Sequence, residues 1–158
     1  MKESAIEPIV ADDLNEIETE RLALSLVERC RVFPGAVWLM EGDLGAGKTT
    51  FVRFASQGLG IDDTVNSPTF NLCNQYEGRS GNLNHFDLYR LSPLSLDELE
   101  FAELWESLSD TFTINAIEWW TRLPSIHSRL PFVRIRLAAN GEKRSIIAHF
   151  FEPGEMKP

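Results

Sequence analysis

The sequence contains little of what secreted, membrane-spanning or disulfide-stabilised proteins depend on. Only two cysteines occur in 158 residues. Cys30 and Cys73 lie in apolar-periodic stretches without a C-x-x-C spacing, so we expect two reduced core thiols rather than a disulfide or a nucleophile. No apolar run approaches the roughly 20 residues that cross a bilayer, and residues 1–10 lack the basic and apolar regions of a signal peptide. These absences predict a cytoplasmic protein with no membrane contact.

Positive charge is also scarce. The chain has 15 Lys and Arg against 24 Asp and Glu, which gives a formal net charge of −9. An acidic surface repels nucleic-acid phosphates unless basic side chains gather on one face. We therefore expect no tight, direct binding to DNA or RNA, although a local basic face stays open as an alternative. The residues that would form it lie near the C-terminus: Arg129, Arg134, Arg136, Lys143 and Arg144.

Two functional signatures are missing as well. His85, His127 and His149 have no mutual spacing that indicates a catalytic triad or a metal site, so we expect neutral histidines with structural roles. The guanine-selective pattern N-K-x-D does not occur. Its absence makes GTP a weaker candidate ligand but does not by itself select adenine.

What the sequence does have is the patterning of one globular domain over residues 1–158, with 43% hydrophobic and 25% charged residues. Helical periodicity predicts helices over 16–30, 48–60 and 95–108, the last with Ser95 and Glu98 as a capping box. Apolar or alternating runs predict strands over 35–40, 69–77, 83–90 and 112–120, and a hairpin over 131–151 with Asn140-Gly141 as its turn. Together these elements predict an α/β fold with a mixed sheet, parallel at its centre and antiparallel at its flanks.

The decisive motif connects the first predicted strand to the second predicted helix. Residues 42–49, GDLGAGKT, match G-x-x-x-x-G-K-[ST] in full. Glycines let backbone N–H groups turn inward around phosphates, and the following helix adds its positive dipole end. Because a buried strand precedes the motif and a helix follows it, we expect a P-loop NTPase-like three-layer domain rather than a Gly-rich turn with an exposed lysine.

This phosphate-binding loop assigns roles to its last residues. Lys48 is predicted to reach the β- and γ-phosphates, and the Thr49 hydroxyl to bind Mg²⁺. We expect nucleotide contacts from Gly42, Asp43, Leu44, Gly45, Ala46, Gly47, Lys48, Thr49 and Thr50.

Such a site needs a carboxylate opposite Thr49, at the end of a neighbouring buried strand. The run INAIE places Glu118 there. P-loop proteins commonly carry Asp at this point, and the longer Glu suits a contact through water. A solvated carboxylate at a strand end is the alternative for Glu118. Trp119, the next residue, is compatible with covering the nucleotide or with filling the core.

Two more polar residues stand in apolar surroundings. Asp87, in HFDLYR, is predicted to position or deprotonate a water, or to support the metal, with an ion pair to Arg90 as the alternative. Thr69, which follows Pro68, is predicted to contact Mg²⁺ as a switch residue, with an ordinary loop-to-strand junction as the alternative. The predicted catalytic residues are Lys48, Asp87 and Glu118, and the predicted metal ligands are Thr49, Thr69 and Glu118.

Five stretches, GDLGAGKTTFVR, VNSPTFNLCNQYE, HFDLYRL, LDELEF and AIEW, occur over residues 19–119 in an order that resembles the TsaE family of bacterial P-loop ATPases. The resemblance implies ATP and Mg²⁺ as cofactors and weak ATP hydrolysis by the chain alone. It implies a requirement for N6-threonylcarbamoyladenosine at position 37 of tRNAs that read ANN codons. It further implies action on the TsaD–TsaB heterodimer, with tRNA contacted only weakly or through that complex.

The resemblance also covers single residues. Lys48 and Thr49 match the family's phosphate and Mg²⁺ positions, and Glu118 matches its metal-associated acid. Asp87 matches an aspartate that the family needs for activity. Thr69 falls in the family's switch-like loop.

Three residues outside these positions bear on the resemblance. Thr19 matches a threonine near the adenine, and Trp119 follows the acid as the family pattern predicts. The family usually continues E-W-P, whereas this chain has Trp120 in place of the proline. The expected shape of the following loop is therefore open, while the acid itself is not in question.

Two other functions suit a short P-loop domain. A small-molecule kinase normally carries an inserted lid with several arginines, and the segment after Trp120 offers Arg122 and Arg129 but no long insertion. A nucleotide switch without useful turnover differs from an ATPase only in rate. A partner-coupled ATPase is the reading that we expect, with the kinase and the switch as alternatives.

Overall fold

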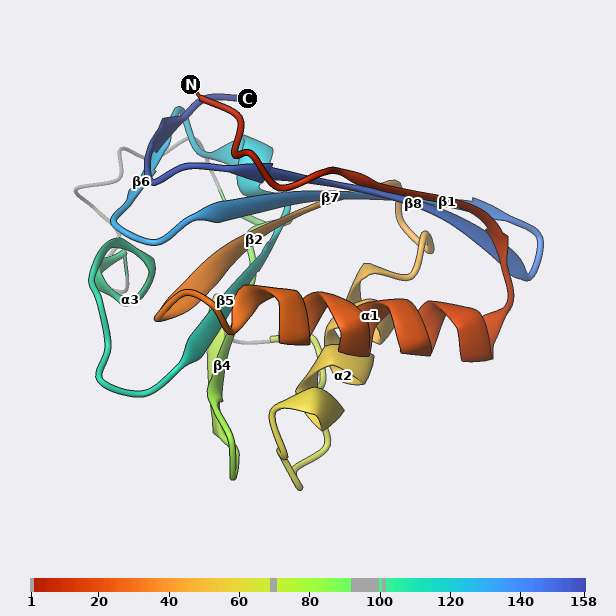
Figure 1. Cartoon of the computed structure of the whole chain (residues 1–158), viewed down its shortest axis with the longest axis horizontal. Helices are drawn as coiled ribbons and strands as arrows, with labels where there is room; N and C mark the ends of the chain where they lie inside the picture. Colours follow the sequence, from red (N-terminus) through yellow and green to blue (C-terminus); the bar gives the residue numbers. More distant parts are fainter. Residues whose placement is uncertain (1, 69–70, 92–99, 101) are drawn as a thin grey trace.

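A seven-stranded mixed sheet in the order β1-β8-β7-β2-β5-β4-β3 organises the molecule (Figure 1). The β7–β2, β2–β5 and β5–β4 pairs are parallel, and the outer pairs are antiparallel, which confirms the predicted sheet. The computed structural model describes residues 2–68, 71–91, 100 and 102–158. The strands of this sheet are β1 (Ile9–Leu14), β2 (Gly35–Glu41), β3 (Cys73–Glu77), β4 (Asn82–Asp87), β5 (Thr113–Glu118), β7 (Phe132–Asn140) and β8 (Lys143–Phe151).

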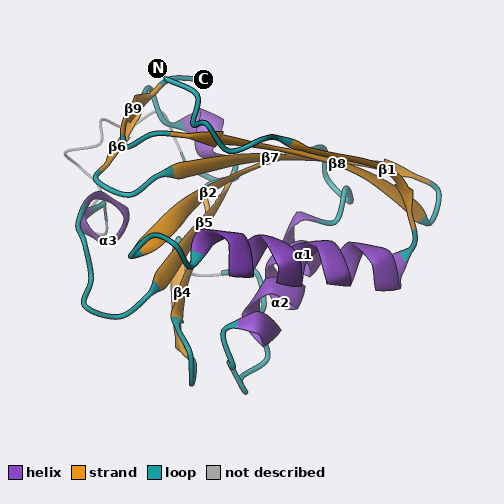
Figure 2. Ribbon diagram, viewed as in Figure 1, coloured by secondary structure: helices purple, strands orange, loops and turns teal. Residues whose placement is uncertain are grey.

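Two helices cover one face of the sheet. α1 (Glu16–Cys30) has the predicted bounds, and Asn15 begins it with a capping box in which the Asn15 side chain accepts from the Glu18 N–H. α2 (Lys48–Gly58) follows the P-loop directly. The two helices pack against each other (Figure 2) and bury one core with the apolar residues of the sheet.

The other face carries a second core under short elements: α3 (Glu103–Glu106), η2 (Trp120–Arg122) and a small sheet of β6 (Ile126–Ser128) and β9 (Gly154–Met156). Along β2, Trp38 and Met40 face the first core, whereas Val37 and Leu39 face the second. This explains why β2 reads as a continuous apolar run. The sheet is therefore the middle of three layers, as predicted.

Strand register brings the functional segments to one edge. β2 leads into the P-loop at its carboxyl end, where Met40 lies opposite Glu118. On the other side of β5, Glu118 lies opposite Asp87. Because carboxyl ends of parallel strands share one edge, the P-loop and both acids meet there.

Some predicted boundaries were wrong. The hairpin turn is Gly141-Glu142 rather than Asn140-Gly141, because Asn140 still pairs with Lys143. Gly141 then takes the first central position with a φ of 61°. Of the helix predicted over 95–108, the described residues contain only Glu103–Glu106. The capping box at Ser95 and Glu98 lies outside the described residues, as does Thr69.

Both cysteines are free. Burial raises the pKa of the Cys30 thiol to about 11 and that of the half-buried Cys73 to about 12, so neither forms a thiolate readily near neutral pH. Within the described residues, no helix is long and apolar enough to cross a membrane.

Candidate functional site

The P-loop has the backbone that a phosphate cradle requires. Gly42 has a φ of 153°, and a Cβ there would come within 2.6 Å of the Leu137 carbonyl oxygen. Gly47 has a φ of 100° and begins α2 as its N-cap. Since a glycine N-cap has no side chain to accept from the first N–H groups of the helix, these donors are left for an anion.

Lys48 lies within this loop and is buried, with 5% of its surface exposed. Its Nζ donates to the carbonyl oxygens of Gly42 (2.5 Å) and Asp43 (3.0 Å) and lies 4.7 Å from the centre of the Trp119 ring. Burial lowers the pKa of Lys48, while Glu118 and nearby aspartates oppose this change. The ammonium group is thus held at the loop by carbonyls, an aromatic ring and negative charge.

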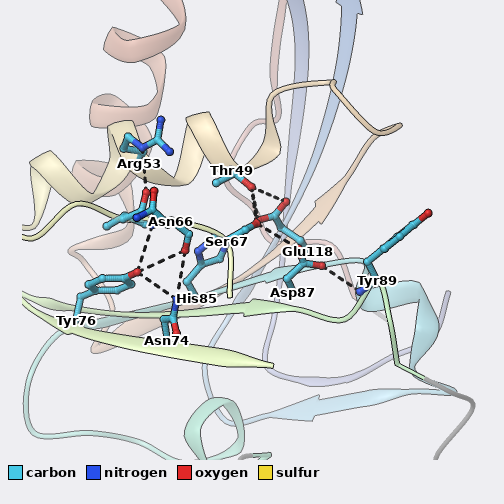
Figure 3. Close-up of polar contacts among 11 residues, drawn as sticks. Thr49, Arg53, Asn66, Ser67, Asn74, Tyr76, His85, Asp87, Tyr89 and Glu118 are labelled. Carbon is cyan, nitrogen blue, oxygen red and sulfur yellow. Dashed lines mark hydrogen bonds and ion pairs between the residues drawn. The ribbon is translucent and has the colours of Figure 1, made fainter. Parts of the chain in front are cut away.

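A hydroxyl–carboxylate network connects α2, β5 and β4 (Figure 3). The Thr49 hydroxyl donates to Glu118, at 3.0 Å from Oε2 and 3.2 Å from Oε1. It also lies 3.1 Å from the Ser67 hydroxyl, which donates to Asp87 Oδ2 at 3.2 Å. The structure therefore brings Lys48, Thr49, Glu118 and Asp87 together, as the sequence predicts.

The alternatives for the two acids fit less well. Glu118 is 3% exposed, so it is not a solvated carboxylate at a strand end. Asp87 accepts from the Tyr89 N–H at 3.0 Å as well as from Ser67. Among the described residues, no ion pair joins Asp87 to Arg90.

Ser67 is a site residue that sequence reasoning did not single out. Its loop is fixed from both sides, because Arg53 Nε donates to the Val65 carbonyl at 3.0 Å and the Asn66 N–H donates to the Tyr76 hydroxyl at 3.3 Å (Figure 3). The only signal in the sequence was its place before Pro68, in the loop where Thr69 was predicted to act.

His85 is a second unpredicted contact. It was expected to be a neutral structural histidine, yet its Nε2 lies 2.5 Å from Glu118 Oε2. The side chain is fully buried, and Nδ1 has no hydrogen-bond partner among the described residues. His85 thus takes part in the site through Glu118.

A cavity of about 710 Å³ opens over this network, between the P-loop and the residues after β4 and β5. Trp119 is half-buried and lines this cavity. It directly follows β5 and has a left-handed backbone φ of 59°. Its ring lies 5.0 Å from that of Tyr89. Trp120, in contrast, is fully buried and donates to Glu41 Oε1 at 3.1 Å. The residue in place of the family's proline therefore packs in the core.

A smaller cavity of about 380 Å³ adjoins the same loop, and Gly47, Thr50 and Arg144 line both cavities. Thr19 lines the smaller one and donates to the Asn15 carbonyl at 2.8 Å. Arg144 is held at the β7–β8 turn by bonds to the carbonyls of Gly141 and Lys143. Sequence reasoning had grouped Arg144 with a basic face and missed its place beside the P-loop.

Two other residues of that basic face are paired with an acid. Arg134 and Arg136 both bind Glu41, at 2.8 and 2.9 Å. Burial opposes ionisation of Glu41, but the hydrogen bonds from these two arginines hold its pKa below the ordinary value. Glu41 therefore offsets one of their two positive charges at the strand that enters the P-loop.

The oxygen donors suit Mg²⁺. The Thr49 and Ser67 hydroxyls and the two carboxylates are hard ligands of the kind that Mg²⁺ prefers. The described residues contain no group of three or more His, Cys, Asp and Glu side chains that could enclose a metal.

Comparisons with known proteins find one matching family and several relatives. The family model described as threonylcarbamoyl adenosine biosynthesis protein TsaE matches residues 14–146. A protein of that name from Nostoc is 43% identical over 117 residues, 73% of this chain and 72% of the relative. One from Synechocystis is 41% identical over 95 residues, 60% of each chain. The crystal structure of Bacillus subtilis YdiB has a TM-score of 0.64 and 26% identity, covering 94% of this chain and 88% of that one.

Proposed function

The chain belongs to the TsaE family, and from this membership we propose that it binds ATP with Mg²⁺ and hydrolyses it in support of tRNA threonylcarbamoyladenosine biosynthesis. The relatives' names supply the pathway. The proposed chemistry rests on the geometry of the P-loop edge, which is the end of the sheet where the P-loop, Glu118 and Asp87 meet. Since β1 and β8, from opposite ends of the chain, pair in one sheet, we propose that the chain acts as a single domain.

One observation carries the proposal: the Thr49 hydroxyl is 3.0 Å from the Glu118 carboxylate, beside the loop that holds Lys48. A P-loop hydroxyl and a strand-end acid are the two protein groups that hold Mg²⁺ in such ATPases. Bound there, Mg²⁺ would neutralise charge that develops on the β- and γ-phosphates. A Gly-rich turn with an exposed lysine would not require this contact between Thr49 and Glu118.

Other side chains near the P-loop have proposed roles in binding the nucleotide and in activating water. Lys48 would leave its two carbonyl acceptors to bind the β- and γ-phosphates. Asp87, held by Ser67 and the Tyr89 N–H, faces the same cavity and would orient or deprotonate the attacking water. Thr19 and Arg144 would contact the nucleotide from the adjoining cavity.

We propose the TsaD–TsaB heterodimer as the partner and the cytoplasm as the location. With a net charge of −9 and two arginines engaged by Glu41, the chain is a poor direct ligand for tRNA. A partner that holds the tRNA removes the need for a large basic surface. The chain would thus contact tRNA only weakly or through the complex.

The kinase and the non-hydrolysing switch remain the alternatives. A kinase would transfer phosphate to a metabolite in the absence of the heterodimer. A switch would bind ATP and support modification without releasing phosphate. Phosphate release that rises with TsaD–TsaB excludes both.

The pathway is tested in a bacterium depleted of its own TsaE, by mass spectrometry of the threonylcarbamoyladenosine in its tRNA. We expect the wild-type chain to restore the nucleoside and Lys48→Ala to fail. Lys157→Ala, at an exposed lysine that lines neither cavity beside the P-loop, is the matched control and should restore it. Restoration by Lys48→Ala, or none by the wild type, would contradict the proposal.

A further inference from the structure

His85 is a buried ionisable side chain that the proposed hydrolysis does not use. It lies on β4, on the same face as Glu118 of the neighbouring β5, two residues before the Asp87–Glu118 pair. Its exposed fraction is 0% and its Nε2 is 2.5 Å from Glu118 Oε2. Because the same carboxylate accepts from Thr49, His85 contacts the acid on which the proposed metal site depends.

The surroundings of the ring identify its hydrogen-bonding form. Nδ1 is buried and has no partner among the described residues. A proton on Nδ1 would therefore leave an N–H group without an acceptor, which costs more than leaving a lone pair unmet. An ionised Glu118 can only accept hydrogen bonds. Both facts place the proton on Nε2, from which it is donated to Glu118.

The Glu118 carboxylate needs this second hydrogen-bond donor to be held in one orientation. A glutamate has one more side-chain torsion than the aspartate common at this point of P-loop proteins, so its carboxylate is harder to hold in one orientation. The Thr49 hydroxyl alone bonds both oxygens, at 3.0 and 3.2 Å, and does not distinguish them. The bond from His85 fixes Oε2 alone.

We propose that His85 is a positioning residue for the metal-associated acid: its Nε2–H holds Glu118 Oε2, so that the carboxylate faces Thr49 and the Mg²⁺ of the nucleotide. This proposal rests on the proposed function, in that it concerns the same metal site. Partners that orient a ligating carboxylate or imidazole typically change metal affinity by about 10- to 100-fold when they are removed.

Three substitutions separate positioning from packing. Gln places an N–H near the position of Nε2, whereas Asn places its amide near Nδ1, where there is no partner. Met keeps the volume without a donor. We expect His85→Gln to resemble the wild type, and His85→Asn and His85→Met to need at least about 10-fold more Mg²⁺ for half-maximal strengthening of ATP-analogue binding. A role in packing alone would not favour Gln over Asn.

The readout is isothermal titration of a non-hydrolysable ATP analogue into folded protein, over a series of Mg²⁺ concentrations and in EDTA. Affinity in EDTA should be the same for all four proteins. Equal Mg²⁺ dependence of His85→Gln and His85→Asn would overturn the proposal. Failure of the wild type to bind the analogue more tightly with Mg²⁺ would instead refute the metal site of the proposed function.

The wild-type protein gives a second test that needs no stable variant. Long-range ¹H–¹⁵N spectra of the histidine rings report which nitrogen carries the proton, and His127→Gln and His149→Gln assign the other two rings. We expect the His85 proton on Nε2. A proton on Nδ1 with Nε2 bare would overturn the proposal.

Discussion

β4 and β5 each contribute to two buried polar clusters, one on each face of the sheet. On the face towards α2, His85 and Glu118 extend the hydroxyl network of the P-loop. On the face towards α3, Asn84 donates to Asn115 at 2.9 Å, and Gln75 approaches Asn84 at 3.4 Å. This amide row lines a cavity of about 500 Å³. The two clusters share strands, with members one residue apart on β4 (Asn84 and His85) and three apart on β5 (Asn115 and Glu118), yet one contains charged groups and the other contains only amides.

The side chains in each cluster indicate whether the cluster serves ligand binding or stability. Amides carry both donors and acceptors, so Asn84 can bond Asn115 without any ligand, although Asn115 Nδ2 has no partner among the described residues. The buried Glu118 and the partly exposed Asp87, with hydroxyl and imidazole partners, keep unused acceptors, and burial of such charge costs free energy unless a cation balances it. At the P-loop edge, substitutions should therefore reduce activity with little loss of stability. In the amide row, they should reduce stability with little loss of activity.

The largest effect is expected at Lys48. Lys48→Ala removes the charged donor to the phosphates and should weaken ATP binding by about 100-fold or more, equivalent to roughly 2.7 kcal/mol. Because burial lowers the pKa of this lysine, its loss should leave the free energy of unfolding unchanged or higher. Calorimetric titration and urea unfolding measure the two quantities. A large loss of stability with normal ATP binding would show that Lys48 serves the fold rather than the ligand.

The next effect concerns turnover rather than binding. Glu118→Ala and Asp87→Ala should each lower ATP hydrolysis by about 100-fold or more, because one loses the acid beside Thr49 and the other the group that orients water. ATP binding should fall much less. Glu77→Ala, at an exposed acid at the end of β3, is the control and should hydrolyse normally. Unchanged hydrolysis in both site variants would refute their assigned roles.

The amide row should respond in the opposite way. Asn115→Ala leaves the Asn84 amide without its acceptor in a buried position, so we expect a loss of about 1–3 kcal/mol in the free energy of unfolding. Hydrolysis by the folded protein should stay within about twofold. The double variant Asn84→Leu with Asn115→Leu removes both partners and should recover much of the stability. Reduced hydrolysis by folded Asn115→Ala would show that the two clusters are coupled.

The smallest effect is a pH dependence at Glu41. Its lowered pKa in the folded state means that its contribution to stability is present above the ordinary carboxyl pKa and is lost as the pH falls through the folded value. Replacing Arg134 and Arg136 by Ala should cost about 1 kcal/mol at neutral pH, since both arginines are partly exposed. The difference from the wild type should shrink at about pH 3. A constant difference in urea unfolding at both pH values would contradict the assignment.

Much of the fold and part of the site follow from local sequence. The bounds of α1 and the buried character of β2 could be predicted because periodicity and caps act within a few residues. The P-loop could be predicted because its glycines, Lys48 and Thr49 are contiguous. Glu118 could be predicted because it follows a buried apolar run, and Asp87 because it is a carboxylate in apolar surroundings.

Other contacts depend on which strands become neighbours. The contact of His85 with Glu118 exists because β4 pairs with β5 in one register, and no local pattern states that register. Arg144 lies beside Gly47 of the P-loop because it follows the β7–β8 turn and β7 pairs with β2. Ser67 reaches Thr49 because Arg53 and Tyr76 fix its loop. The hairpin turn was misplaced by one residue because both candidate turns contain Gly141.

The decisive measurement is phosphate release from ATP by the wild-type chain and by Glu118→Ala in the presence of Mg²⁺. Each protein is assayed with and without purified TsaD–TsaB heterodimer. We predict slow release by the wild type alone and faster release with the heterodimer. Glu118→Ala should stay near background in both cases although it still binds ATP. Equal release by the two proteins, or no response of the wild type to the heterodimer, would contradict a partner-coupled ATPase built on Thr49 and Glu118.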